Sequence, residues 1–239
     1  MADSQFGTLY FIPVTMGADN INQVLPPDVV TLAQGLDEFI VENEKTARHF
    51  LGAIKHKKPI REITLKTLNK RTEDKDLSKL LSTLITGKDV GLMSEAGCPG
   101  IADPGAKLAA LAHQKGIRVA PLVGPSSILL GLMASGLNGQ RFTFLGYLPA
   151  DRGARIKQLK ALEQRAKSHN ETQIFIETPF RNQHMLEDLL GHCSNDTKLC
   201  IARNISLPDE YIVTKKIGAW KQATPPDLHK KPTVFLLLA

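Results

Sequence analysis

Cysteine is scarce in this sequence, and no pair of cysteines has the spacing of a disulfide framework or a zinc site. The 239 residues include only Cys98, Cys193 and Cys200, and none of them forms a CxxC pair. An odd number of separated thiols is typical of reduced cysteines in the cytosol. The histidines are equally scattered, without an HxH or HExxH arrangement, so no metal ion is expected.

Long apolar runs are also missing. No segment contains the roughly 18 to 20 consecutive apolar residues that a membrane-crossing helix needs. The amino terminus lacks the basic, apolar and small-residue pattern of a secretory signal. We therefore expect a soluble, cytoplasmic protein without a membrane partner, whose 42% hydrophobic residues form a sizeable core.

Three common signatures of catalysis are absent. The sequence contains no GxxxxGK followed by Ser or Thr, and no GxGxxG follows the first predicted strand. Nucleotide hydrolysis and hydride transfer therefore lack their expected phosphate-binding loops. No Ser, His and Asp set suggests nucleophilic catalysis either.

Positive charge is in moderate excess. Lys and Arg total 30 against 24 Asp and Glu, a formal net charge of +6, with a basic run at residues 55–61. Such an excess favours polyanionic partners through counterion release, although it carries no sequence information. A solvated basic surface without any partner is the alternative reading of charge alone.

Strand and helix signals alternate along the chain, which indicates an α/β protein. Helices are expected over 77–85 with Gly87 as the C-terminal cap, and from Asp103 as N-cap and Pro104 to Gly116. Further helices are expected after Gly124, after Asp151 and around the apolar residues Met185, Leu186, Leu189 and Leu190. Short connections in the first half imply parallel neighbours. We place the boundary between two α/β domains at 123/124. Strands are expected at 8–13, 90–94, 117–122, 142–145, 173–177, 198–202, 211–215 and 233–238.

The segment Gly91–Gly105, GLMSEAGCPGIADPG, is the most informative part of the sequence. A strand runs into small residues and prolines before a helix begins, so that a ligand can approach the main chain and the free N–H groups of the helix start. Ligands of parallel sheets bind at the carboxyl ends of the strands. An ordinary Gly- and Pro-punctuated turn is the alternative.

Several ordered motifs together resemble the 16S ribosomal RNA ribose 2′-O-methyltransferase family, within the tetrapyrrole-methylase-like class III methyltransferases. They are GTLYFIP, the loop above, IRVAPLVGPSSILLGLMASGL, FTFLGYLP, RGAR, IFIETPFR and IAR. The resemblance covers nearly the whole chain. It implies a two-domain tetrapyrrole-methylase-like α/β enzyme, usually a homodimer, with S-adenosylmethionine in the cleft between the domains and ribosomal RNA or the small ribosomal subunit as partner.

The resemblance also assigns positions. Family members usually carry aspartate where Glu95 stands, and a surface or capping carboxylate is the alternative for Glu95. Asp103 is expected to be structural first. Cys98 is expected to be a small apolar filler without a catalytic role. The cofactor positions implied are Pro13, Ser94, Glu95, Ala96, Ile101, Ala102, Ser126, Ser127, Glu177, Ala202, Pro232 and Thr233.

Four arginines are candidates for substrate binding. Arg152 and Arg155 open a basic helix, where paired guanidinium donors suit phosphate, and solvated helix charge is the alternative. Arg181 and Arg203 are flanked by apolar or Pro-Phe residues and favour substrate or interdomain contacts. No residue is identified as a general base, because methyl transfer depends mainly on positioning the acceptor in line with the sulfonium.

Two segments depart from the family pattern. Where the family usually has EDTR, this chain has Glu42 to Lys45, and its usual RELTK becomes Arg203 to Leu207, RNISL. The cofactor loop is thus better matched than segments expected to touch substrate. Two alternatives stay open: a methyltransferase acting on a tetrapyrrole or other small molecule, and a catalytically silent RNA-binding paralogue.

Overall fold

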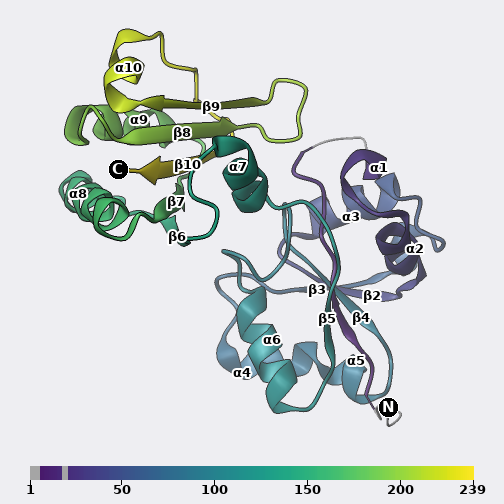
Figure 1. Ribbon diagram of the computed structural model, residues 1–239. Helices are drawn as coiled ribbons and strands as arrows, with labels where there is room; N and C mark the ends of the chain where they lie inside the picture. The colour runs from purple at the N-terminus through teal and green to yellow at the C-terminus, as the bar shows by residue number, and fades with distance from the viewer. Residues whose placement is uncertain (1–5, 18–20) are drawn as a thin grey trace. The chain divides into compact units, whose positions relative to one another are not determined.

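The computed structural model describes residues 6–17 and 21–239, and the chain divides into two compact units. Unit 1 is Met1–Ser126 and unit 2 is Ser127–Ala239. Each unit contains one five-stranded sheet with helices packed on it (Figure 1). The α/β prediction is therefore confirmed.

The sheet of unit 1 is entirely parallel. Its order is β3-β2-β4-β1-β5. The strands are short and rich in β-branched and aromatic residues, as suits a sheet buried on both faces. They span β1 Leu9–Phe11, β2 Glu38–Val41, β3 Thr64–Thr67, β4 Val90–Met93 and β5 Val119–Pro121.

Alternate residues of these strands enter two different cores. Phe39 and Val41 pack with one group of helices, whereas Leu9, Phe11 and Ile40 pack with the other. Figure 1 shows α1, α2 and α3 on one side of this sheet and α4, α5 and α6 on the other. The helices are α1 Ile21–Val24, α2 Pro27–Gly35, α3 Glu44–Ala53, the 3-10 turn Ile60–Glu62, α4 Asp74–Leu80, α5 Ser82–Ile85 and α6 Gly105–Gln114.

Two expected helix boundaries in unit 1 were wrong. The helix expected over 77–85 is interrupted at Leu81, which caps α4 and precedes α5, and Ile85 at its end is 46% exposed. The apolar stripe itself faces the core as expected, since it includes the buried residues Leu77, Leu80, Leu81 and Leu84. Helix α6 begins at Gly105 with Pro104 at the N-cap position, and the carboxylate of Asp103 accepts from the N–H groups of both Gly100 and Gly105.

The sheet of unit 2 is mixed. Its order is β6-β7-β10-β8-β9, with β6 parallel to β7 and the other neighbours antiparallel. The last strand of the chain thus lies in the centre of the sheet, and its first five residues are buried. The strands are β6 Phe142–Tyr147, β7 Thr172–Ile176, β8 Lys198–Arg203, β9 Tyr211–Lys216 and β10 Thr233–Leu238.

Helices cover both faces of this second sheet. The main core lies under α8, α9 and α10 and includes Phe175, Trp220 and Phe235. Helix α7 packs on the opposite face (Figure 1), where Gly131 lies close to Ala202 and Leu236. The helices are α7 Ser127–Ser135, α8 Arg152–His169, α9 Asn182–His192 and α10 Ile217–Gln222.

Candidate functional site

The carboxyl ends of the parallel strands bring the loops of unit 1 together. The loops that follow β1, β2 and β4 begin at Ile12, Glu42 and Ser94, and the neighbouring strands run in the same direction. Because parallel strands end at the same edge, this edge collects residues from distant parts of the chain. It is where the predicted cofactor positions Pro13 and Ser94 lie.

The first turn of the 94–105 loop is bonded to the segment after β2. The main-chain N–H of Glu95 donates to Oε2 of Glu42 at 3.2 Å, and Nδ2 of Asn43 donates to Oε1 of Glu95 at 3.2 Å. The Ser94 hydroxyl donates to the carbonyl of Ala96 at 3.2 Å. Glu95 and Ala96 themselves are exposed, so the turn is held in place while its outer surface stays open.

The middle of the same loop packs against the segments after β1 and β5. Val14 N–H donates to the carbonyl of Gly97 at 3.0 Å, and the Cys98 thiol lies 3.3 Å from the carbonyl of Pro125. A β-carbon on Gly97 would lie 3.2 Å from that carbonyl, in a left-handed backbone conformation with φ of +70°. Glycine is therefore required where three loops converge.

The returning limb of the loop is fixed by Asp103. Its carboxylate accepts from the N–H of Gly100, at 2.9 and 2.8 Å, and from the N–H of Gly105 at 2.7 Å. Ala102 has a φ of +63°, a left-handed conformation that costs about 1 to 3 kcal/mol in a residue with a side chain. The predicted positions Ile101 and Ala102 are thus presented on the surface, with Ile101 53% exposed.

Two partly buried carboxyl groups line a pocket at this edge. Burial raises the pKa of Glu42, with contributions from the nearby Asp103 and Glu95, although the N–H of Glu95 lowers it. Burial also raises the pKa of Asp103, against the lowering effect of its two main-chain donors. The ionised carboxylates of Glu42 and Asp103 are therefore poorly solvated, and a cationic ligand nearby would stabilise them. Glu42, Leu68, Leu92, Met93, Ser94, Pro99, Asp103, Pro104 and Gly105 line the pocket.

Unit 2 contributes a second group of predicted residues at one end of its sheet. The strand register pairs Thr233 with Arg203, and Arg203 with Tyr211, across β10, β8 and β9. Glu177 follows β7, which pairs with β10 through Val234 and Ile176. The predicted positions Glu177, Ala202, Pro232 and Thr233 therefore lie within one region of unit 2, with Arg181 and Arg203 beside them.

Glu177 combines deep burial with an unsatisfied oxygen. Its side chain is 1% exposed, and Oε1 accepts from Thr178 N–H at 2.6 Å and from Arg181 at 2.6 and 3.0 Å. The other oxygen, Oε2, is buried without a hydrogen-bond partner in the protein. Such orphan acceptors are costly and mark the position of a missing donor. Glu177 is therefore suited to accept from an amino or hydroxyl group of a ligand.

The four predicted substrate arginines have different environments. Arg155 is 5% exposed and binds Asp188 through Nε and Nη2 at 2.9 and 2.7 Å, and its Nη1 donates to the carbonyl of Ala150. Arg152 donates to the same carboxylate at 2.9 Å, yet its side chain is 70% exposed. The burial of Arg155 argues against the expected substrate contact, because its charge holds α8 to α9. Arg152 stays accessible.

Arg203 is also tied to its own unit. Its two terminal nitrogens donate to the carbonyls of Asp227 and Asp209, at 3.0 and 3.1 Å. Its guanidinium lies 5.3 Å from the centre of the Tyr211 ring, a cation–π distance, and Nε is buried without a partner.

The two serines stand at the junction of the units. Ser126 is the last residue of unit 1 and Ser127 is the first residue of α7. Both are partly exposed, and their role toward a cofactor stays a prediction.

Two residues of the unit 1 edge were missed as site residues. Glu42 and Asn43 follow β2 directly and both bind Glu95. Their signal is their place after a parallel strand, but the expected strands did not include Glu38–Val41. In the sequence the two residues stand where the family usually has EDTR, a pattern of which only Glu42 is kept.

The described residues contain neither a cluster of metal-binding side chains nor a helix that could cross a membrane. Among residues 6–17 and 21–239, no three His, Cys, Asp or Glu side chains gather to hold a metal ion. Over the same ranges, no helix combines the length and apolar character needed to cross a membrane.

Comparisons with known proteins show the family of this chain. The family model for tetrapyrrole (corrin/porphyrin) methylases matches residues 13–220. A protein of Escherichia coli O157:H7 named ribosomal RNA small subunit methyltransferase I is 32% identical over 222 residues, 92% of this chain and 73% of its own. A protein of the same name from Xylella fastidiosa is 28% identical over 97% of this chain and 81% of its own.

Solved structures share the fold at low sequence identity. The methyltransferase CobJ has a TM-score of 0.64 at 19% identity, covering 98% of this chain and 94% of its own. The uroporphyrin-III-C-methyltransferase of Thermus thermophilus has a TM-score of 0.55 at 15% identity, covering 97% and 92%. With the matched family model spanning most of both units, the chain belongs to the tetrapyrrole (corrin/porphyrin) methylase family and is a methyltransferase.

Proposed function

We propose that this methyltransferase uses S-adenosylmethionine to methylate the 2′-hydroxyl of a ribose in 16S ribosomal RNA. The observation that carries the proposal is the 32% identity to a ribosomal RNA small subunit methyltransferase I over 92% of the chain. Similarity over that length includes both units and not only the cofactor loop. The net charge of +6 supports a polyanionic substrate.

The carboxyl edge of unit 1 suits a cationic cofactor. When bound, S-adenosylmethionine supplies a methyl group activated by a positively charged sulfur. Ser94 to Ala96, Ile101 and Ala102 belong to the 94–105 loop, Pro13 follows β1, and the partly buried carboxyls of Glu42 and Asp103 favour positive charge at this edge. In unit 2, the orphan Oε2 of Glu177 fits a donor group. Roles for Ser126, Ser127, Ala202, Pro232 and Thr233 remain predictions from the family pattern.

The protein's part in the reaction is to position the acceptor. The chain would hold the ribose hydroxyl in line with the methyl donor, and the hydroxyl proton would pass to water, so orientation would supply most of the acceleration and no covalent intermediate is needed. Arg152 is the best placed of the four arginines to bind phosphate, because its guanidinium is exposed and is held in one direction by Asp188. No described side chain is assigned as the base.

Calorimetric titration with S-adenosylmethionine tests the cofactor site. We expect Glu95→Ala to weaken binding and Glu62→Ala, an exposed carboxylate of the same unit, to leave it unchanged. Folded wild-type protein that shows no binding at millimolar donor would overturn the proposal. Equal binding by both variants would remove Glu95 from the site.

Modification mapping tests the substrate. Ribosomal RNA from cells with and without the gene is compared for 2′-O-methyl marks. We expect one mark to disappear and to return with wild type but not with Glu95→Ala. An unchanged map, with cofactor binding intact, would exclude 16S ribosomal RNA as substrate.

The tetrapyrrole alternative rests on the matched family model and on the shared fold. CobJ and the Thermus thermophilus enzyme share at most 19% identity with this chain, which shows a common fold and leaves the acceptor open. Methyl transfer to a tetrapyrrole, with the ribosomal RNA map unchanged, would select it. We also propose a cytoplasmic homodimer from the family resemblance, and light scattering of the purified protein tests its mass.

A further inference from the structure

An aromatic side chain stands exposed beside the Glu177 region of unit 2. Phe180 lies in the short segment between β7 and α9, and it is 66% exposed. Leaving a large apolar ring in water is unfavourable, so an exposed phenylalanine that is held in place indicates a binding surface. The cofactor positions predicted above do not include it.

Two side chains from a distant turn surround this ring. The His229 ring stands edge-on to Phe180, with centroids 6.3 Å apart and planes at 79°. The ammonium of Lys230 lies 5.9 Å from the Phe180 centroid. His229 and Lys230 are both exposed, so the ring combines an accessible surface with a positive charge.

Backbone hydrogen bonds hold the two segments together. Lys230 N–H donates to the carbonyl of Pro179 at 3.0 Å, and Asn182 Nδ2 donates to the carbonyl of Lys231 at 2.7 Å. Lys230 itself adopts a left-handed backbone with φ of +57°. The ring and its cation are therefore pre-organised, which reduces the entropy lost on binding.

We propose that Phe180 and Lys230 form a platform on which an unpaired base of the RNA substrate stacks, with Lys230 close to the neighbouring phosphate. The proposal rests on the proposed function and adds the residues that hold single-stranded RNA. An aromatic face next to a cation is the usual arrangement for bases of unpaired strands, since every base has a face to stack. The ammonium of Lys230 beside the ring favours a partner with phosphate groups over an apolar protein surface.

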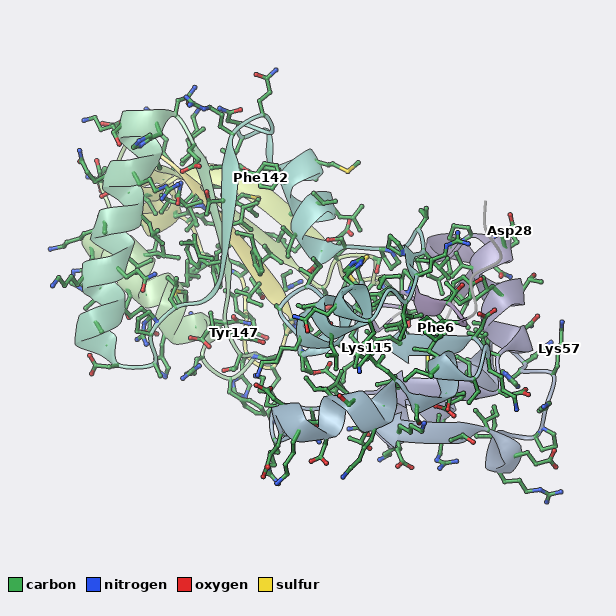
Figure 2. All side chains as sticks on the ribbon, turned by 90° about the horizontal axis from the view of Figure 1, so that it is seen from below. Phe6, Asp28, Lys57, Lys115, Phe142 and Tyr147 are labelled. Atoms are coloured by element: carbon green, nitrogen blue, oxygen red, sulfur yellow. The ribbon has the colours of Figure 1, made fainter. Side chains whose placement is uncertain are left out.

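The chain offers a matched control at the other end of the same sheet. Phe142 is 39% exposed and begins β6, opposite Thr172 at the start of β7, whereas Phe180 follows the end of β7. Figure 2 shows the side chains of Phe142 and Tyr147 toward the two ends of β6. Replacing Phe142 removes an exposed ring from the same unit without touching the platform.

Fluorescence anisotropy with a labelled single-stranded RNA of about ten nucleotides measures the interaction. We expect Phe180→Ala to weaken binding by about 5- to 100-fold, Phe180→Trp to preserve it and Phe142→Ala to leave it unchanged. Lys230→Gln should lower the slope of log affinity against log salt by about 0.7, whereas Phe180→Ala should keep the slope. A duplex of the same sequence should not distinguish wild type from Phe180→Ala.

Other results would overturn the platform. Wild-type affinity in Phe180→Ala, or an equal loss in Phe142→Ala, excludes stacking at this ring. Full affinity in Phe180→Leu shows an apolar contact without stacking. Loss of binding to the assembled small subunit alone, with oligonucleotide affinity unchanged, shows a protein contact. Unchanged tryptophan fluorescence of each variant excludes misfolding.

The platform and the proposed function fail in different ways. If wild type methylates ribosomal RNA and Phe180→Ala does so equally well at limiting RNA, only the platform is wrong. If wild type binds S-adenosylmethionine but neither methylates nor binds RNA, both are wrong.

Discussion

Replacement of Asp188 separates a structural role of the basic α8 helix from a role in substrate binding. The Asp188 side chain is 2% exposed and accepts hydrogen bonds from Arg152 and Arg155. Asp188→Asn keeps the shape but removes the charge, which leaves the Arg155 guanidinium buried without a counterion. We expect unit 2 to lose stability.

The magnitude follows from the different exposure of the two arginines. Removing one partner of a buried ion pair costs about 3 to 5 kcal/mol. Arg155 keeps the carbonyls of Pro149 and Ala150 as acceptors, so we expect about 3 kcal/mol for Asp188→Asn. Arg152 is 70% exposed, and Arg152→Ala should cost about 1 kcal/mol or less.

Urea unfolding followed by tryptophan fluorescence measures these costs. Trp220 is the single tryptophan of the chain and is buried in the core of unit 2, so its signal reports the unfolding of that unit. In a double-mutant cycle, Asp188→Leu with Arg155→Met should cost about 2 kcal/mol less than the sum of the single variants.

A contrary outcome would restore the substrate role of Arg155. If Asp188→Asn costs less than about 1 kcal/mol, the buried ion pair does not stabilise unit 2 as inferred. If Arg155→Met then lowers RNA affinity at unchanged stability, Arg155 binds substrate and its burial changes in the complex.

Three further predictions concern pH, the thiols and a glycine contact. Burial alone would raise the pKa of Asp188, but the hydrogen bonds from its arginines outweigh burial and lower the pKa. The stabilisation by this carboxylate is therefore present above the ordinary carboxyl range and is lost as pH falls through the lowered pKa. Acid unfolding of wild type should be steeper than that of Asp188→Asn. Burial, with the nearby Glu163, raises the pKa of Cys193 to about 12. A thiolate-selective reagent at about pH 8 should therefore label Cys193 only after unfolding. Rapid labelling of the native protein would contradict the burial of this thiol. A β-carbon on Gly124 would lie 2.2 Å from Cβ of Pro13; Gly124→Ala should therefore cost about 1 to 3 kcal/mol in thermal unfolding and weaken cofactor binding, whereas Gly35→Ala, with open space around it, should not.

Local patterns in the sequence were sufficient for many of the elements. The long basic helix expected after Asp151 is confirmed as α8, and the Asp151 carboxylate caps it by accepting from Ala154 N–H at 2.8 Å. The alternation of strand and helix signals predicted an α/β protein, since both periods are properties of short segments. The Gly91–Gly105 segment was predicted as the end of a strand, a loop and the start of a helix, and the loop lies between β4, which ends at Met93, and α6, which begins at Gly105.

Local patterns failed where packing competes with them. The helix expected over 77–85 is interrupted at Leu81, and Ile85 at its end is exposed, although the rest of the apolar stripe is buried. Arg155 was expected to bind substrate. The sequence of a basic helix is the same whether its arginines are solvated or paired with a buried carboxylate. Its partner Asp188 is 33 residues away, and only the packing of α8 on α9 brings the two together.

The sequence by itself thus determined the class of fold, the position of the loop between β4 and α6 and the family, because each depends on residues that are close along the chain. The tertiary structure decided which distant side chains meet: Glu42 with Glu95, Arg155 with Asp188, and Phe180 with Lys230. Strand order and register control these encounters, as when the last strand β10 enters the centre of the second sheet between β7 and β8. Hydrophobic periodicity specifies which face of a segment is buried but not which segment lies opposite, so such pairs become visible only in the folded chain.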